Sequence, residues 1–279
     1  VSCTGPSKSF TITVNPSANV EQPTAQVICS SDTYSLNFTT ANTGGTTTYS
    51  WTNNNTAIGL TAASGNGSIP SFTAINSGLA PVVATFTVTP TYTNGGVSCV
   101  GSPTSFTLTI NPRADVAQPA SQEVCNGAST GSVTFSSLNI SGTTTYNWTN
   151  SDTSIGLPIS GTGPVIPSFN AVNTGNVPVV ATITVTPTYT NAGVNCSGPS
   201  KTFTITVYPS AEVNQPAPQV VCNGTFTTLV NFSSNNLGGV TTYSWTNNNT
   251  TIGLASNGIG SIPNFTAVNS GTTPIVATI

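Results

Sequence analysis

Residues 47–53 read Thr-Thr-Tyr-Ser-Trp-Thr-Asn, and this stretch decides the architecture because it returns twice. It comes back at residues 144–150 as Thr-Thr-Tyr-Asn-Trp-Thr-Asn and at residues 241–247 as Thr-Thr-Tyr-Ser-Trp-Thr-Asn. Its three tryptophans, Trp51, Trp148 and Trp245, are 97 residues apart each time. A period this long exceeds one turn of a solenoid and suits a domain with its own core. The sequence therefore predicts a tandem array of compact domains.

The cysteines keep the same period in two series. Each series has spacings of 96 and 97 residues, one running Cys3, Cys99, Cys196 and the other Cys29, Cys125, Cys222. No Cys-x-x-Cys pair occurs. Six cysteines in two fixed positions indicate disulfides formed in an oxidising compartment, and free buried thiols in a cytosolic protein are the alternative. We expect an extracellular, cell-surface location.

The phase of the repeats predicts where the domains lie. Val1-Ser2-Cys3 aligns with residues late in the later repeats, and residues 274–279 align with the middle of a strand in the second repeat. We expect a window on a longer array, with these divisions: residues 1–16 as the last strand of a preceding repeat, 17–112 and 113–209 as whole repeats, and 210–279 as an incomplete repeat.

Composition removes several classes of function. Charged residues make up 3% of the chain, with three Lys and Arg against six Asp and Glu. Binding nucleic acid requires a cluster of basic side chains, so we expect no nucleic-acid partner. No run of about 18 apolar residues is present, so we expect no membrane insertion in this stretch.

The strand pattern predicts an all-β fold. In the second repeat Val179, Ala181, Ile183 and Val185 alternate with residues that are mostly threonine, as in a half-buried antiparallel strand. About seven such short strands per repeat predict tandem Ig-like, PKD-like antiparallel β-sandwich domains in an elongated array. Pro90 and Pro187 interrupt the longest strand, which predicts that this strand lies at a sheet edge or ends there.

Several sequence motifs recur in the repeats and indicate a family resemblance. They include Val-Cys-Asn-Gly at 124–127 and 221–224, Ile-Pro-Ser-Phe at 69–72 and 166–169, and Val-Thr-Pro-Thr-Tyr-Thr-Asn at 88–94 and 185–191. Over the whole chain, the sequence with these motifs resembles the PKD-like repeats of giant Bacteroidetes surface proteins. The resemblance implies the stalk of SprB-type gliding adhesins and other substrates of the type IX secretion system. One feature departs from ordinary PKD domains, since an Asp-rich glycine turn is missing.

No catalytic or metal site is predicted. Histidine is absent, which excludes Ser-His-Asp and Cys-His catalysis and histidine-containing zinc sites. No acidic residue recurs in every repeat, so we expect neither a carboxylate pair nor a calcium site, and no cofactor. The three tryptophans could stack on sugar rings if exposed, but a tryptophan at this place in a sandwich more often belongs to the core. We expect Trp51, Trp148 and Trp245 in the core.

Two disulfide arrangements are open. Cys29 with Cys99 and Cys125 with Cys196 would close bonds inside single repeats. In an Ig-like sandwich, however, Cys29 and Cys99 belong at opposite poles, whereas a disulfide needs Cα atoms about 4.4–6.8 Å apart. We therefore favour Cys29 with Cys196, a bond between consecutive domains.

These observations predict a structural stalk of a large extracellular surface adhesin rather than an enzyme. Its partners would be neighbouring repeats of the same chain, with surface glycans bound by regions outside the window. Two other functions remain open: repeats that bind glycans themselves, and subunits that assemble into an extracellular filament or sheath.

Overall fold

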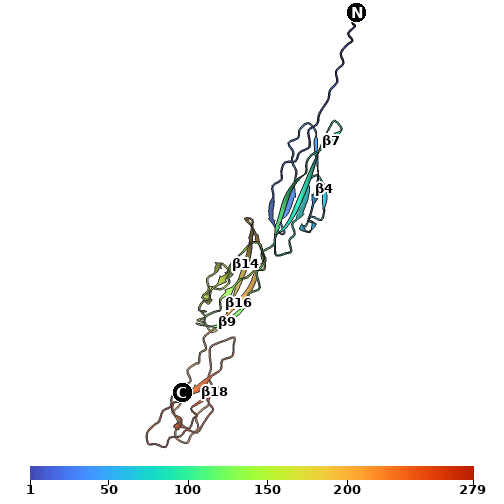
Figure 1. Cartoon of the computed structure of the whole chain (residues 1–279). Coiled ribbons are helices and arrows are strands. Elements are labelled where there is room, and N and C mark those ends of the chain that lie inside the picture. The colour runs from blue at the N-terminus through green and yellow to red at the C-terminus, as the bar shows by residue number, and fades with distance from the viewer.

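The computed structural model describes all residues from Val1 to Ile279. The repeats lie end to end in one elongated array, and an extended N-terminal segment continues its long axis (Figure 1). Residues 1–16, expected as the last strand of a preceding repeat, form no strand here. No helix has the length and apolar character needed to cross a bilayer.

Repeat 1 and repeat 2 are built from the same strands in the same order. The strands of repeat 1 are β1 (Gln26–Cys29), β2 (Thr33–Leu36), β3 (Thr46–Asn53), β4 (Ser64–Asn66), β5 (Ile69–Thr73), β6 (Val82–Asn94), β7 (Val97–Val100) and β8 (Thr104–Asn111). Those of repeat 2 are β9 (Gln122–Cys125), β10 (Val133–Thr134), β11 (Thr143–Asn150), β12 (Ser160–Thr162), β13 (Val165–Ile166), β14 (Val179–Asn191), β15 (Val194–Ser197) and β16 (Lys201–Tyr208).

The third repeat has less regular structure. It contains β17 (Ser244–Thr246) paired with β18 (Asn257–Ile259), and single bridges join Phe226 to Thr266 and Val230 to Ile262. Each repeat also has one turn of 3₁₀ helix after the tryptophan strand: η1 (Thr56–Ile58), η2 (Thr153–Ile155) and η3 (Thr250–Ile252).

Each complete repeat is a sandwich of one large and one small sheet. The large sheet of repeat 1 has the order β1-β8-β6-β3-β4, with β7 also on β6, and the small sheet pairs β2 with β5. Repeat 2 has the matching order β9-β16-β14-β11-β12, with β15 on β14 and β10 on β13. The all-β, Ig-like sandwich expected from the sequence is confirmed.

The core follows the alternation seen in the sequence. Along β14 the apolar side chains of Ala181, Ile183 and Val185 are buried while the intervening threonines face outward. In repeat 1 the Phe86 and Phe106 rings stack with centroids 5.3 Å apart, and Trp51 meets Phe86 edge-on at 6.2 Å. The small sheet closes this core with Tyr34 and Ile69.

The expectation that the proline strand lies at an edge is wrong, because β6 and β14 are central strands. Pro90 sits where the partner of β6 changes, since β8 pairs as far as Val88 and β7 begins at Thr91. The missing N–H therefore faces the gap between these two partners, and the Pro90 carbonyl accepts a hydrogen bond from the Gly101 N–H at 2.9 Å. Pro187 lies at the same place in repeat 2, with the Gly198 N–H as its donor.

One strand pair is parallel, which the sequence analysis does not anticipate. The first strand β1 pairs with the last strand β8 in the same direction, and β9 pairs with β16 likewise. Both strands of each pair run from the upper pole, where the β6–β7 or β14–β15 turn lies, to the lower pole, which faces the next repeat. The chain therefore enters each domain at one pole and leaves at the other, as an end-to-end array requires.

The two upper turns give a paired test of backbone strain. Both are two-residue turns with positive φ, formed by Gly95 (60°) and Gly96 (77°) in repeat 1 but by Ala192 (49°) and Gly193 (77°) in repeat 2. A Cβ in this conformation costs about 1–2 kcal/mol, against about 0.5–1 kcal/mol of extra entropy lost by glycine. We expect Ala192→Gly to stabilise repeat 2 and Gly95→Ala to destabilise repeat 1, each by roughly 0.5–1 kcal/mol, in urea denaturation.

A Cβ on Gly95 would meet no atom within 4 Å, so a steric clash would not contribute to the change in stability of Gly95→Ala. Equal midpoints for both variants and the parent chain would contradict the assignment of strain.

Candidate functional site

The junction between repeats 1 and 2 is the most elaborately bonded feature outside the cores. It is formed by the lower pole of repeat 1, where β1 and β8 end, and by the upper pole of repeat 2, where the β14–β15 turn lies. Contacts of four kinds meet here: a disulfide, a pair of asparagines, a backbone hydrogen bond and a buried connecting segment.

The disulfide joins Cys29 to Cys196 across this junction, with Cα atoms 5.5 Å apart. Cys29 is the last residue of β1, and Cys196 lies in β15 with its side chain 1% exposed. Cys99 and Cys125 carry no disulfide. Cys99 lies in β7 at the opposite pole from Cys29, so the intra-repeat pairing would have to span a whole domain.

Beside the disulfide, two asparagines bond each other reciprocally. The Asn111 amide donates to the Asn191 main-chain carbonyl at 3.2 Å, and the Asn191 amide donates to the Asn111 side-chain oxygen at 2.9 Å. Asn111 is 0% exposed. Because it is buried and paired, it contributes stability only while repeat 2 is docked against repeat 1.

A main-chain hydrogen bond crosses the junction on its other side. The Ile140 N–H donates to the Leu79 carbonyl at 3.0 Å. Both groups are held from within their own domains. Asn76 donates to the Ala80 carbonyl at 2.8 Å and so shapes the loop that carries Leu79, while the Tyr189 hydroxyl donates to the Ile140 carbonyl at 2.9 Å.

The connecting segment between the domains is buried and hydrogen-bonded along most of its length. Asn111, Pro112 and Ala114 are buried. The Asn139 amide donates to the Arg113 carbonyl at 3.1 Å, and its oxygen accepts from the Asp115 N–H at 2.7 Å. A Cβ on Gly198 would lie 1.8 Å from the Ala114 carbonyl oxygen, so the connection runs directly against that glycine. This segment cannot act as a flexible linker.

Two of these contacts recur, one at each neighbouring junction. At the upper pole of repeat 1, Asn15 and Asn94 repeat the arrangement, with each amide donating at 3.0 Å. Between repeats 2 and 3 the Leu237 N–H donates to the Asn176 carbonyl at 2.7 Å, as Ile140 does to Leu79. The asparagine pair and the main-chain hydrogen bond are therefore not confined to one junction.

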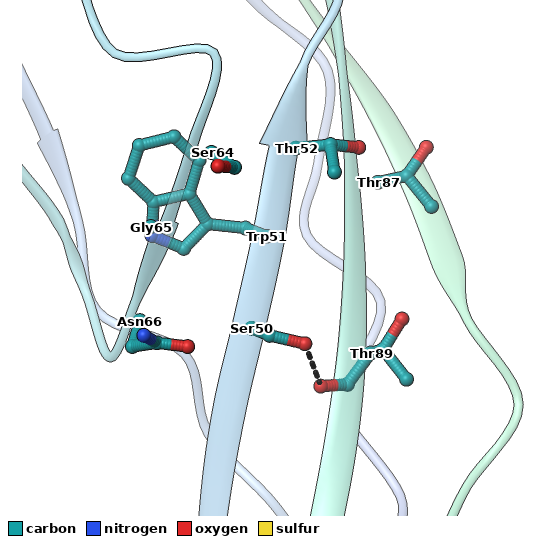
Figure 2. Close-up of a pocket in the computed structure, with 8 residues that line it drawn as sticks. All are labelled: Ser50, Trp51, Thr52, Ser64, Gly65, Asn66, Thr87 and Thr89. Atoms are coloured by element: carbon teal, nitrogen blue, oxygen red, sulfur yellow. Dashed lines mark hydrogen bonds between the residues drawn. The ribbon is translucent and has the colours of Figure 1, made fainter.

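The tryptophans are structural. Trp51 is 3% and Trp148 6% exposed, whereas Trp245 is only partly buried. The long strand that covers the other two has as its counterpart in repeat 3 only residues 274–279, which form no strand. The indole of Trp51 lies across Gly65 on β4, where a Cβ would come within 2.4 Å of the ring (Figure 2). Gly161 and Gly258 serve Trp148 and Trp245 in the same way, and none of the three indole N–H groups has a hydrogen-bond acceptor.

The hollow above Trp51 is a shallow, open groove of about 290 Å³. It is lined mainly by hydroxyl and amide side chains, namely Ser50, Thr52, Ser64, Asn66, Thr87 and Thr89 (Figure 2). Its aromatic floor is covered, so no ring is available for stacking on a sugar.

Titratable chemistry is sparse. No group of three or more His, Cys, Asp or Glu side chains gathers anywhere in the structure. Tyr208, which takes the place of Asn111 in repeat 2, donates to Glu123 at 3.2 Å, and this hydrogen bond raises the pKa of Tyr208. Hydrogen bonds from Ser154 lower the pKa of Asp152, which caps η2 where repeats 1 and 3 use Asn55 and Asn249. Neither group belongs to a reactive cluster.

The sequence analysis selected Cys29 and Cys196 but missed the asparagines around them. A signal was present, since Asn94 and Asn191 recur 97 residues apart and Asn15 and Asn111 recur 96 apart. In a chain so rich in asparagine, that recurrence is obscured by many others that face solvent.

The asparagine pair should hold the two cysteines in position before they bond. We expect Asn111→Ala to remove both hydrogen bonds, about 1 kcal/mol or more, and so to lower the equilibrium constant for closing Cys29–Cys196 against glutathione by roughly tenfold. The measurement is quantitative mass spectrometry of oxidised and reduced chain in glutathione buffers.

Asn15→Ala is the matched control, because it removes both hydrogen bonds of the equivalent pair at the far pole of repeat 1 and should leave the constant unchanged. Identical constants for Asn111→Ala and the parent chain would show that the pair does not orient the cysteines.

Comparisons with known proteins find similar domains. Solved structures that match with probability 1.00 include a chimeric titin Z1Z2 carrying a decorin peptide, at 13% identity and a TM-score of 0.25, with 72% of this chain and 100% of that one covered. They also include the Ig1-2 module of the Drosophila receptor tyrosine phosphatase DLAR (12%, 0.25, 70% and 100%) and the insect immune protein hemolin (11%, 0.28, 82% and 61%). No curated protein matches the sequence. A family model described as a PKD-like domain matches residues 26–114, which begin with β1 and end just after β8. Repeat 1 is therefore similar to PKD-like domains.

Proposed function

We propose that this chain is a stiff spacer: the stalk of a large extracellular surface adhesin. The observation that carries the proposal is the Cys29–Cys196 bond, which joins consecutive domains pole to pole. A covalent bond between domains holds the direction of one domain relative to the next, which is what a stiff spacer requires. The disulfide also supports the extracellular location.

The surface composition fits the same role. Charged residues are 3% of the chain, and the outward faces of the long strands carry threonine. Threonine suits a strand and keeps its surface hydrated without charge. The shape of such an array does not depend on repulsion between charges, which salt would screen.

The resemblance to the repeats of Bacteroidetes gliding adhesins supplies the finer part of the proposal. In this assignment the stalk belongs to a type IX secretion substrate and holds a distal adhesive region away from the cell. Antibody labelling of intact cells of the source organism, before and after mild surface proteolysis, tests this part. Epitopes that become accessible only after lysis would contradict it.

A stiff spacer should keep its length in any ionic strength. The 13-residue strand β6 spans about 44 Å, so the chain should exceed roughly 100 Å in maximum dimension. We expect small-angle X-ray scattering to give the same maximum dimension in 10 mM and 1 M NaCl, because few charges are present to be screened. A compact particle, or one whose length changes with salt, would contradict the stalk.

The rival function is glycan recognition by the repeats themselves, at the hydroxyl-lined groove over Trp51. Because that indole is buried, we expect the chain to give no specific signal on a carbohydrate array. Binding that is lost on Ser50→Ala or Asn66→Ala, and kept on Thr85→Ala, an outward threonine of β6 that does not line the groove, would favour the rival over the stalk.

A further inference from the structure

We infer that the Cys29–Cys196 bond makes the array nearly inextensible, by routing tension around the folded strands instead of through them. This inference deepens the proposed stalk function but depends only on the connectivity of the chain. Tension in a polypeptide follows its shortest covalent path. Between Cys29 and Cys196 that path is the disulfide, so the residues between them are bypassed.

The segment leading to Cys29 is already stretched along the axis of repeat 1. Asn15 bonds Asn94 at the upper pole, Gln22 donates to the Ser105 carbonyl at 3.1 Å, and Gln26 pairs with Leu108 further down. Cys29 then lies beside Asn111 at the lower pole. Residues 15–29 therefore cross the domain once, in extended form, and have no hidden length to release.

The segment that follows Cys196 does the same in repeat 2. β15 runs downward from the upper turn, and β16 continues to Tyr208 at the lower pole, antiparallel to β14. Tension that crosses the disulfide therefore passes along β15 and β16, which are already extended along the axis of repeat 2. The strands that build most of each core, β2 to β7 and β9 to β14, lie off this path.

A second path would lie beside the first once Cys99 and Cys125, which are free here, are bonded to neighbouring repeats. β8 runs down repeat 1 to Asn111 and continues directly into residues 112–125, which run down repeat 2 to Cys125, beside Tyr208. In each complete repeat the two paths are the two strands of the parallel pair, β1 with β8 and β9 with β16. At the junction the two paths change strands. The disulfide leads from β1, the first strand of repeat 1, to β15 and β16, the last strands of repeat 2. The peptide chain leads from β8, the last strand of repeat 1, to β9, the first strand of repeat 2.

The unpaired cysteines occupy the positions needed to continue both paths. Cys125 ends β9 as Cys29 ends β1, and it is exposed. Cys99 lies in β7 opposite Tyr92, as Cys196 lies in β15 opposite Tyr189. The partner that fits each of them is therefore another PKD-like repeat, presenting a β7-type cysteine to Cys125 or a β1-type cysteine to Cys99.

Single-molecule stretching of the 279-residue chain between its termini tests the bypass. In the oxidised chain we expect no unfolding step from either complete domain, since residues 29–196 cannot lengthen. After reduction in place, the fully stretched chain should be longer by about 550–600 Å, the extended length of a chain segment whose ends are separated by 167 positions.

Cys29→Ser should behave like the reduced chain without any reductant, and Cys99→Ser, the matched control, should behave like the oxidised parent. If Cys29→Ser does not fold, reduction of the folded parent chain gives the same comparison. An unfolding step from either complete domain in the oxidised chain would overturn the inference. A chain that is inextensible here yet absent from the cell surface would refute the stalk and leave the bypass standing.

Discussion

The parallel pairing of the first and last strands is the constraint on which the rest of this structure depends. An antiparallel pair would return the chain to the pole where it entered, and the repeats could not follow one another in a line. With β1 beside β8, the chain enters and leaves at opposite poles, and the lower pole of one domain meets the upper pole of the next. This arrangement brings Cys29 to Cys196 and Asn111 to Asn191, although each pair is far apart in sequence.

Hydrogen bonds of uncharged asparagine side chains fix the loops and junctions of this protein, where many surface proteins use ion pairs. Asn76, Asn111 and Asn173 are buried, and each has its amide bonded to main-chain carbonyls or to another asparagine. A buried amide that is fully bonded costs little, whereas one that loses its partner costs about 1–3 kcal/mol. The loops and junctions are therefore specified in geometry without being sensitive to salt or, over most of the pH range, to protonation.

Small residues mark the places where the backbone of one element meets another closely. Gly65 and Gly161 leave room for the indoles of Trp51 and Trp148, and Gly198 leaves room for the connecting segment at Ala114. The prolines serve a related purpose on the central strands, since Pro90 and Pro187 lie where the strand changes partner. Proline inside a strand usually marks an edge, but a missing N–H needs only a local gap in the ladder, and the break between two partners supplies one.

Much of this architecture was determined by the sequence alone. The recurrence of the tryptophan segment at 97 residues predicts an array, and the alternation along residues 179–185 predicts half-buried strands of a sandwich. Periodicity in sequence is local, so it survives without knowledge of the partners. The direction of β1 beside β8, the central place of the proline strands and the asparagines across the junction were decided only by tertiary structure. Each of these depends on which strand lies next to which, and the two residues that meet there are up to 83 positions apart, beyond the reach of any local pattern.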